Sequence, residues 1–184
     1  MKFIRISGLI ILLISFCGML NAENYEVDVC VYGGTSAGVI AAYTVSSLGK
    51  TVLLIEPGCH LGGLSSGGLG ATDIGNKFAI TGMSLDFYRR LGAHDGEIEQ
   101  WTFETHVGEK IFSNYGKEAD IHVLYRRRLH KLIKEDVRIR KIVLEHSESP
   151  ERAPRITVKA KAFIDCTYEG DLMAMADVAY TVGR

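Results

Sequence analysis

The segment from residue 27 to residue 56 constrains the fold of this chain more than any other feature. It begins with a β-branched apolar run at residues 27–32, which has the length of a buried strand. A helical pattern follows at residues 36–48, and Gly49 is placed to end that helix. A second continuous apolar run, at residues 51–55, is typical of a strand buried on both faces of a parallel sheet. The segment therefore predicts one βαβ unit with a right-handed crossover.

The turn between the first strand and the helix has the sequence Gly33-Gly34-Thr35-Ser36-Ala37-Gly38. Glycine permits a sharp turn at its start and close packing of helix on strand at its end. Such a turn presents free N–H groups and the positive end of the helix dipole to an anion. In the G-x-G-x-x-G pattern, Thr35 replaces the middle glycine: its β-carbon narrows the approach, and its hydroxyl can donate to a phosphate.

An acidic residue follows the second strand at the spacing that this turn requires. Glu56 is placed to accept hydrogen bonds from the hydroxyls of an adenosine ribose. The alternative is a glycine turn that serves packing alone. The strand before the turn, the helix after it and the acid together favour a dinucleotide-binding site.

The rest of the chain predicts an α/β fold of Rossmann-like type. A glycine- and serine-rich stretch at residues 57–75 has no clear periodicity. Further elements are expected as helices at 84–91 and 104–119, a strand at 121–125, paired strands at 137–145 and 155–164, and a short helix at 171–177. The paired strands predict an antiparallel meander beside the parallel sheet.

The first 22 residues are expected to be a signal peptide. Lys2 and Arg5 precede a largely apolar run, and Ala22 ends it with a small residue suited to cleavage. The run is short for a membrane span, which needs about 20 apolar residues, although a retained anchor is the alternative. A lipoprotein site at Cys17 is disfavoured by the bulky Phe16. The mature chain, residues 23–184, is expected in the periplasm or secreted, without stable membrane association.

Charge and cysteine content restrict the classes of partner and cofactor. A formal net charge of -1 gives no reason to expect nucleic acid or an anionic membrane as a partner. Signal cleavage leaves three cysteines without metal-like spacing. Of these, Cys30 and Cys166 are expected as buried small apolar residues, and no disulfide framework is predicted. The histidines also lack metal-ligand spacing, so no metal is assigned.

Several motifs in one order resemble the FAD-dependent oxidoreductases of glutathione-reductase-type fold. Within these the chain is similar to an exported bacterial subgroup with GGTxAG openings, some members of which are loosely described as xanthan lyases. The motifs are residues 31–38, Leu54-Ile55-Glu56-Pro57, His60-Leu61-Gly62-Gly63, Trp101-Thr102-Phe103-Glu104 and residues 164–172. The subgroup usually has alanine where this chain has Cys166.

The resemblance implies FAD as the cofactor and assigns roles to particular residues. It implies that the pyrophosphate binds the turn at residues 33–38 and that the ribose binds Glu56. Gly62 and Gly63 would pass near the ribityl chain and the flavin, and the segment from Asp165 through Cys166 and Thr167 would end a strand beside the cofactor. A flexible surface loop is the alternative for the glycines between residues 62 and 70.

Other residues keep two interpretations each. His60 either attaches a flavin covalently, as in some flavoproteins, or only forms local hydrogen bonds, and the second is favoured. For Asp73 we favour a turn or cap over a site role. The run at residues 126–128 is interpreted as a solvated face or a helix start, with a phosphate contact as the minority alternative. Trp101 and Phe103 are expected as core aromatics.

The leading functional interpretation is an FAD-dependent oxidoreductase that transfers a hydride from a small-molecule substrate to flavin. Relatives continue beyond this point into a substrate domain and a last FAD-binding segment, so the chain is expected to be the N-terminal part of an incomplete domain. No catalytic residue is assigned. One alternative is a non-catalytic nucleotide-binding fragment or pseudo-enzyme that needs a second chain. An NAD-dependent dehydrogenase is disfavoured, because further βα units would replace the glycine stretch and meander.

Overall fold

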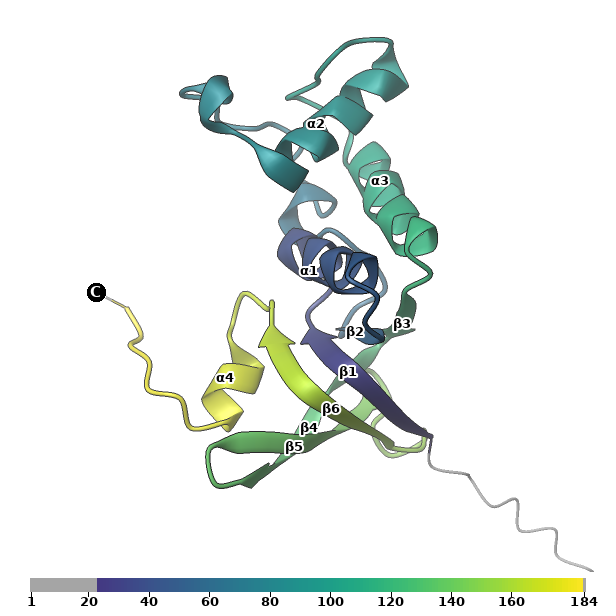
Figure 1. Cartoon of the computed structure of the whole chain (residues 1–184), viewed down its shortest axis with the longest axis vertical. Helices are drawn as coiled ribbons and strands as arrows, with labels where there is room; N and C mark the ends of the chain where they lie inside the picture. Colours follow the sequence, from purple (N-terminus) through teal and green to yellow (C-terminus); the bar gives the residue numbers. More distant parts are fainter. Residues whose placement is uncertain (1–22, 184) are drawn as a thin grey trace, which may run out of the picture.

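The fold is built on a six-stranded sheet in which four neighbouring strands are parallel. Figure 1 shows the sheet of the computed structural model below the helices α1 (Ser36–Ser47), α2 (Gly82–Asp95) and α3 (Thr105–Glu118). The structure describes residues 23–183, so the predicted signal peptide lies outside the described residues. The parallel strands are β1 (Asn24–Tyr32), β2 (Val52–Glu56), β3 (His122–Tyr125) and β6 (Ile156–Asp165). The order across the sheet is β3-β2-β1-β6-β5-β4, so that β1 lies between β2 and β6. The carboxyl ends of β1, β2, β3 and β6 therefore share one edge of the sheet.

The predicted βαβ unit is confirmed. Helix α1 (Ser36–Ser47) connects β1 to β2, and these strands pair in parallel from Val29 with Val52 to Tyr32 with Ile55. Gly49 has a φ of 72°, as expected for a glycine that ends a helix.

Strands β4 (Arg127–Glu135) and β5 (Arg138–His146) extend the sheet in antiparallel fashion. The predicted pairing is confirmed, because β5 pairs with β6 from Lys141 with Lys159 to Leu144 with Ile156. Strand β4 was not predicted from the sequence. Its pairing with β5 shifts register between Leu129 and Lys131 and between Ile133 and Lys134, which interrupts the alternation that would have revealed it.

Arg127 and Arg128 begin this strand and Arg126 directly precedes it, so the helix-start interpretation of residues 126–128 was wrong. Arg126 precedes the strand with a φ of 54°. Its guanidinium lies 2.7 Å from the carboxylate of Glu148, and that of Arg128 lies 2.8 Å from Glu145. Arg127 donates a hydrogen bond to the carbonyl of Pro154. The three arginine side chains therefore bind acceptors in or after the neighbouring strand β5, and Arg127 and Arg128 have the extended conformation of β4.

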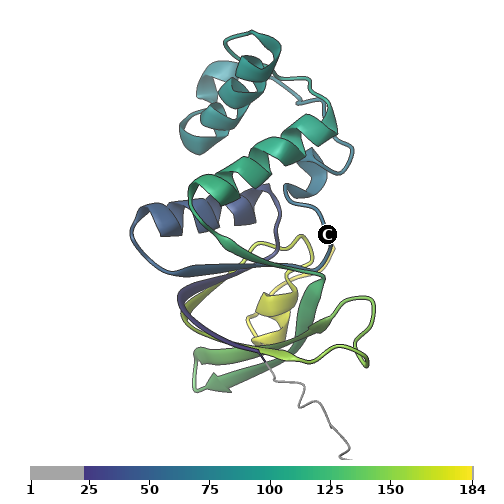
Figure 2. The same ribbon diagram turned by 90° about the vertical axis from the view of Figure 1, so that its right-hand side faces the viewer.

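Two apolar cores lie on opposite faces of the parallel strands. Alternation along β1 places Val31 in the core beneath the helices, and Cys30 and Tyr32 in the core beneath the meander. Figure 2 shows α1 and α3 on one side of the sheet and the curled strands β4 and β5 on the other. Both faces are covered, which explains why β1 and β2 have continuous apolar sequences.

The glycine stretch leads into a helical lobe, which we define as residues 82–118. It contains α2 (Gly82–Asp95) and α3 (Thr105–Glu118), close to the two predicted helices. Single 3₁₀ turns occur before it at Gly63–Ser65 and Lys77–Ala79. The last helix, α4 (Asp171–Met175), follows β6. Within residues 23–183, every helix is too short or too polar to cross a membrane.

Candidate functional site at the carboxyl edge of the parallel strands

The glycine turn brings the backbone of β1 into direct contact with the start of α1. Gly33 has a φ of 104°, a conformation that favours glycine. A β-carbon on Gly38 would overlap the carbonyl oxygen of Gly33. Both glycines are therefore required by the geometry, as the sequence predicted for the sharp turn and for the close packing of helix on strand.

Thr35 is the N-cap of α1, and its hydroxyl is fully engaged inside the protein. The hydroxyl donates to the carbonyl of Cys166 at 2.8 Å and accepts the N–H of Gly38 at 3.3 Å. The side chain is buried. The expectation that this hydroxyl can donate to a phosphate was wrong, because its single proton already binds a backbone acceptor. Its role in this structure is to cap the helix and to tie the turn to the end of β6.

Glu56 lies beside the turn at the end of β2. Its carboxylate accepts the N–H of Gly34 at 2.7 Å and the N–H of Gly58 at 2.5 Å. Hydrogen bonds to a carboxylate are stronger than those between neutral groups, so the side chain is held firmly in place. Each oxygen keeps lone pairs for a further donor. This arrangement is compatible with the predicted ribose contact.

Gly62 and Gly63 lie against the turn, although they are distant from it in the sequence. The N–H of Gly62 donates to the carbonyl of Gly34 at 2.8 Å, and Gly62 forms an isolated parallel bridge with Thr35. Their φ values are 103° and 57°. These two glycines are thus ordered by backbone contacts, and the alternative of a flexible surface loop does not describe them. It fits Gly68 better, since a β-carbon there would meet no atom within 4 Å.

The segment after β6 forms the third side of the site. The N–H of Cys166 donates to the carbonyl of Tyr32 at 2.7 Å. Asp165 accepts hydrogen bonds from the backbone and the hydroxyl of Thr167 and from the N–H of Met173. Burial, together with the negative charge of Asp165, raises the pKa of the Cys166 thiol. The thiol is therefore protonated at neutral pH. Cys166 packs against the core beneath the helices but is only partly buried, so the expectation of a buried residue was met by Cys30 and not by Cys166.

Three loops are thus joined at one edge of the sheet. We call them the turn cluster, defined as residues 33–38, 62–64 and 166–168. Tyr168 closes it, because its hydroxyl accepts the N–H of Leu64 at 2.8 Å. Sequence reasoning missed this residue, although it belongs to the motif at residues 164–172. No sequence signal showed that it lies against a loop more than a hundred positions earlier.

Other candidate residues lie away from the turn cluster or have structural contacts. His60 is 70% exposed and lies 2.8 Å from the carboxylate of Glu109, which agrees with the local hydrogen bond that the sequence favoured. Trp101 stacks on Tyr88 with ring centroids 4.1 Å apart, and Phe103 packs against the core beneath the helices. Cys59 is exposed, whereas burial raises the pKa of the Cys30 thiol to about 12. Within residues 23–183, His, Cys, Asp and Glu form no group suited to a metal ion.

The start of α1 fits an anionic cofactor. Its first turn contains no acidic residue that would oppose an anion, and the N–H groups of such a turn have no intrahelical acceptor. Ser36 and Ala37 line a hollow of about 330 Å³, whose other walls include Ile40 and Phe112. A pyrophosphate attached to larger groups suits an open helix start of this kind, with apolar walls beside it.

Solved structures share this fold at low sequence identity. The glycerol-3-phosphate dehydrogenase from Bacillus halodurans complexed with FAD matches with a TM-score of 0.62 and 10% identity, over 83% of this chain and 36% of that one. The L-proline dehydrogenase from P. horikoshii matches with a TM-score of 0.62 and 13% identity, over 88% of this chain and 58% of that one. A geranylgeranyl bacteriochlorophyll reductase-like protein from Thermoplasma acidophilum matches with a TM-score of 0.57 and 15% identity, over 88% of this chain and 44% of that one. The chain thus spans less than two thirds of each.

The family is shown by a comparison of the sequence itself. A search of curated proteins gives no match. A model of the family described as FAD dependent oxidoreductase matches residues 28–184, which include every loop of the turn cluster. Because that match spans far more than half of the sequence, the chain belongs to the FAD-dependent oxidoreductase family and is an FAD-binding domain of Rossmann-like fold.

Proposed function

We propose that this chain binds FAD for an enzyme that oxidises a small-molecule substrate by hydride transfer. The observation that carries the proposal is the start of α1, where a glycine turn, Glu56 and an open helix end meet. FAD supplies the two-electron acceptor for such a reaction, and the protein supplies binding, orientation and electrostatics. The described residues of this chain account for binding and orientation.

The proposed division of roles follows the order of the strands. The pyrophosphate binds the turn at residues 33–38 through the backbone N–H groups at residues 35–37, because those of Gly33, Gly34 and Gly38 already have acceptors inside the protein. Glu56 accepts hydrogen bonds from the adenosine ribose. Gly62, Gly63 and the segment with Cys166 and Thr167 approach the remainder of the cofactor. Thr35 acts indirectly, because its hydroxyl shapes the turn by binding the carbonyl of Cys166.

A second candidate function is a nucleotide-binding chain that needs another chain for turnover. The contacts at the start of α1 favour it, because they serve nucleotide binding and supply no group that acts on a substrate. Substrate-binding residues in this case come from a second chain that completes the site. The two candidates share the FAD-binding step and differ in whether this chain alone reduces bound flavin when substrate is added.

We also infer that the protein is exported, and that it belongs to a particular subgroup of the family. The basic start, apolar run and small residue at Ala22 support cleavage by a signal peptidase, which mass spectrometry of the protein recovered from the periplasm or medium tests directly. A chain that retains residue 1 after secretion contradicts this inference. The motifs at residues 101–104 and 164–172 support membership of the exported bacterial subgroup, within the glutathione-reductase type.

Titration of the purified chain, residues 23–184, with FAD and with ADP tests the proposed function. We expect bound flavin to remain after removal of excess ligand, with a visible absorption band. Glu56→Gln should weaken the binding of both ligands about tenfold, because the NH₂ group that replaces one carboxylate oxygen cannot accept a hydrogen bond. Glu109→Gln is the matched control, since that carboxylate forms its hydrogen bond with the exposed His60, and the variant should bind both ligands like the wild type.

The result that contradicts the proposal is a folded wild-type chain that retains no FAD. Circular dichroism establishes folding in each variant, so a lost site is distinguished from a lost fold. Equal effects of the two glutamate substitutions would also contradict the role of Glu56.

A further inference from the structure

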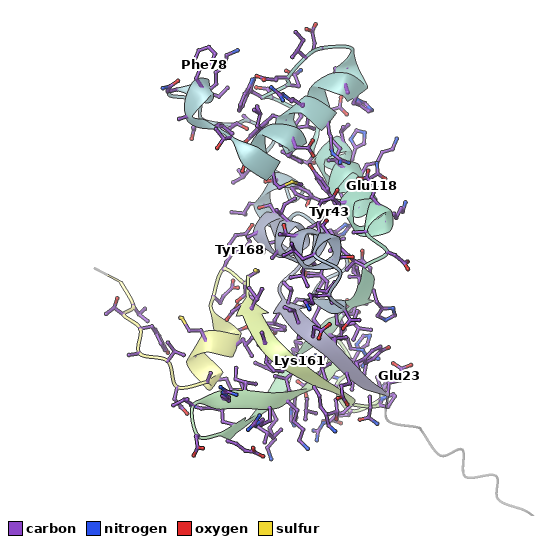
Figure 3. All side chains as sticks on the ribbon, viewed as in Figure 1. Glu23, Tyr43, Phe78, Glu118, Lys161 and Tyr168 are labelled. Atoms are coloured by element: carbon purple, nitrogen blue, oxygen red, sulfur yellow. The ribbon has the colours of Figure 1, made fainter. Side chains whose placement is uncertain are left out.

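Tyr168 is an exposed residue that lies across β1 from Glu56. It follows β6, whereas Glu56 ends β2, and these two strands lie on opposite sides of β1. Figure 3 shows Tyr168 above the end of β6, near α1. A cofactor whose ribose binds Glu56 and whose pyrophosphate binds the turn after β1 therefore extends toward the side where Tyr168 lies.

The hydroxyl of Tyr168 is fixed by the glycine pair. It accepts the N–H of Leu64 at 2.8 Å, and a β-carbon on Gly63 would overlap it. Glycine at position 63 thus permits the phenol to approach the backbone of the second loop. The contact is specific, because the residues come from segments 104 positions apart and meet only through the fold.

The proton of this hydroxyl is available to a ligand. A phenol both accepts and donates, and within residues 23–183 only the accepted bond from Leu64 is formed. Tyr168 is 58% exposed, so a ligand can approach its side chain from solvent. Beside it, Asp165, Thr167 and Tyr168 line a hollow of about 510 Å³. A ligand that follows the turn toward β6 therefore meets a fixed donor with space next to it.

We propose that Tyr168 is a positioning and binding residue for the flavin half of the cofactor. It holds Gly63 and Leu64 in place through its oxygen, and it donates its proton to an oxygen of the cofactor beyond the adenosine diphosphate half. The acceptor is a ribityl hydroxyl or a phosphate oxygen on that side. This inference rests on the proposed function, and it adds a residue that neither the glycine pattern nor Glu56 implies.

The competing explanation is a purely structural one. In it, Tyr168 only ties the second and third loops of the turn cluster together. Loss of that tie would disturb the whole turn and weaken every ligand that binds there. The two explanations therefore differ in whether FAD and ADP are affected to the same extent.

The experiment measures the dissociation constants of FAD and ADP by calorimetry for the wild type, Tyr168→Phe and Tyr25→Phe. Tyr25 is the matched control, because its hydroxyl donates one exposed hydrogen bond to Glu23 at the opposite end of β1. We expect Tyr168→Phe to raise the dissociation constant of FAD about tenfold, which corresponds to the loss of about one hydrogen bond. The dissociation constant of ADP should change by less than about twofold. Tyr25→Phe should change neither.

A spectroscopic measurement adds a readout of position. The visible circular dichroism of bound flavin reports its asymmetric surroundings, and it should change in FAD-saturated Tyr168→Phe but remain unchanged in Tyr25→Phe. If Tyr168→Phe does not fold, the ultraviolet difference spectrum of the wild type is measured in place of the visible circular dichroism of that variant. Addition of FAD should then give a tyrosine difference signal that is lost in the Tyr168→His variant and absent with ADP.

The outcomes of these measurements test the proposed function and the inference about Tyr168 separately. A folded wild type that binds no FAD overturns the proposed function. A wild type that binds FAD, with equal affinity in Tyr168→Phe, overturns the inference and leaves the proposed function standing. Equal weakening of FAD and ADP also overturns it in favour of the structural explanation. Selective weakening of FAD with an altered flavin spectrum supports it.

Discussion

The turn cluster and the helical lobe are held together by different kinds of contact. In the turn cluster, backbone meets backbone: Gly62 donates to Gly34, and a β-carbon on Gly38 has no space. Between α2 and α3 of the helical lobe, side chains make the contacts. The rings of Phe87 and Phe112 stack with centroids 4.7 Å apart, and the hydroxyl of Tyr115 donates to Asp86.

This difference determines what a substitution costs in each region. Where backbones touch, an added methyl group must displace the main chain, and close-packed interiors accommodate that poorly. Where side chains touch, a lost group removes one contact and its neighbours can adjust. We therefore expect the turn cluster to be sensitive to small additions. In the helical lobe we expect tolerance at open positions such as Gly116, but not at Gly92, where a β-carbon would overlap the backbone of Glu99.

The largest effect is expected for Gly38→Ala. Its β-carbon would overlap the carbonyl oxygen of Gly33, so α1 must move away from the end of β1. We expect a loss of about 3 kcal/mol in the free energy of unfolding and no retained flavin. Urea unfolding and visible absorption measure the two effects. A variant of wild-type stability would show that backbone contact does not govern this region.

A smaller loss in the free energy of unfolding is expected for Tyr32→Phe. This substitution removes a hydrogen-bond acceptor at the place where the carboxyl end of β1 meets the meander. The buried hydroxyl of Tyr32 accepts the N–H of Leu129 at 3.0 Å, and burial raises the pKa of this tyrosine to about 12. The phenylalanine leaves a partly buried N–H without a partner, which should cost about 1–2 kcal/mol. Hydrogen exchange of the Leu129 amide should accelerate; an unchanged rate would contradict the assigned bond.

Gly116→Ala in α3 is the direct counterpart of Gly38→Ala. A β-carbon at Gly116 meets no atom within 4 Å, and alanine favours helix over glycine. We expect the free energy of unfolding to rise by about 0.5–1 kcal/mol, with flavin binding unchanged. A destabilised variant would show that the lobe is as closely packed as the turn cluster, and the comparison would fail.

The smallest effect concerns the pH dependence of the lobe. Burial raises the pKa of Asp86, but hydrogen bonds from Tyr115 and Arg90 outweigh it and hold the pKa below its ordinary value. A carboxyl with a depressed folded pKa stabilises above its unfolded pKa, near 3.9, and this stabilisation is lost as pH falls through the folded value. Asp86→Asn should remove that part of the acid sensitivity. Thermal unfolding between pH 6 and pH 3 measures it, and identical slopes in the variant and the wild type would contradict it.

The accuracy of the sequence-based predictions depended on how local each signal was. The βαβ unit and the meander pair were predicted because apolar runs and glycines mark them within short windows. Strand β4 was missed, since its register shifts break the alternation and its arginines bind Glu145 and Glu148 across the sheet. Thr35 was misjudged for the same reason: the acceptor of its proton, Cys166, is 131 positions away.

The sequence by itself determined the type of fold, the place of the glycine turn and the acid that follows the second strand. Each of these depends on neighbours within one βαβ unit, where backbone preference and apolar spacing act locally. Only the tertiary structure decided that Gly62 lies against Gly34, that the Thr35 hydroxyl is already bound, and that Tyr168 reaches Leu64. These contacts join loops after different strands, so they exist only once the parallel strands align their carboxyl ends at one edge of the sheet.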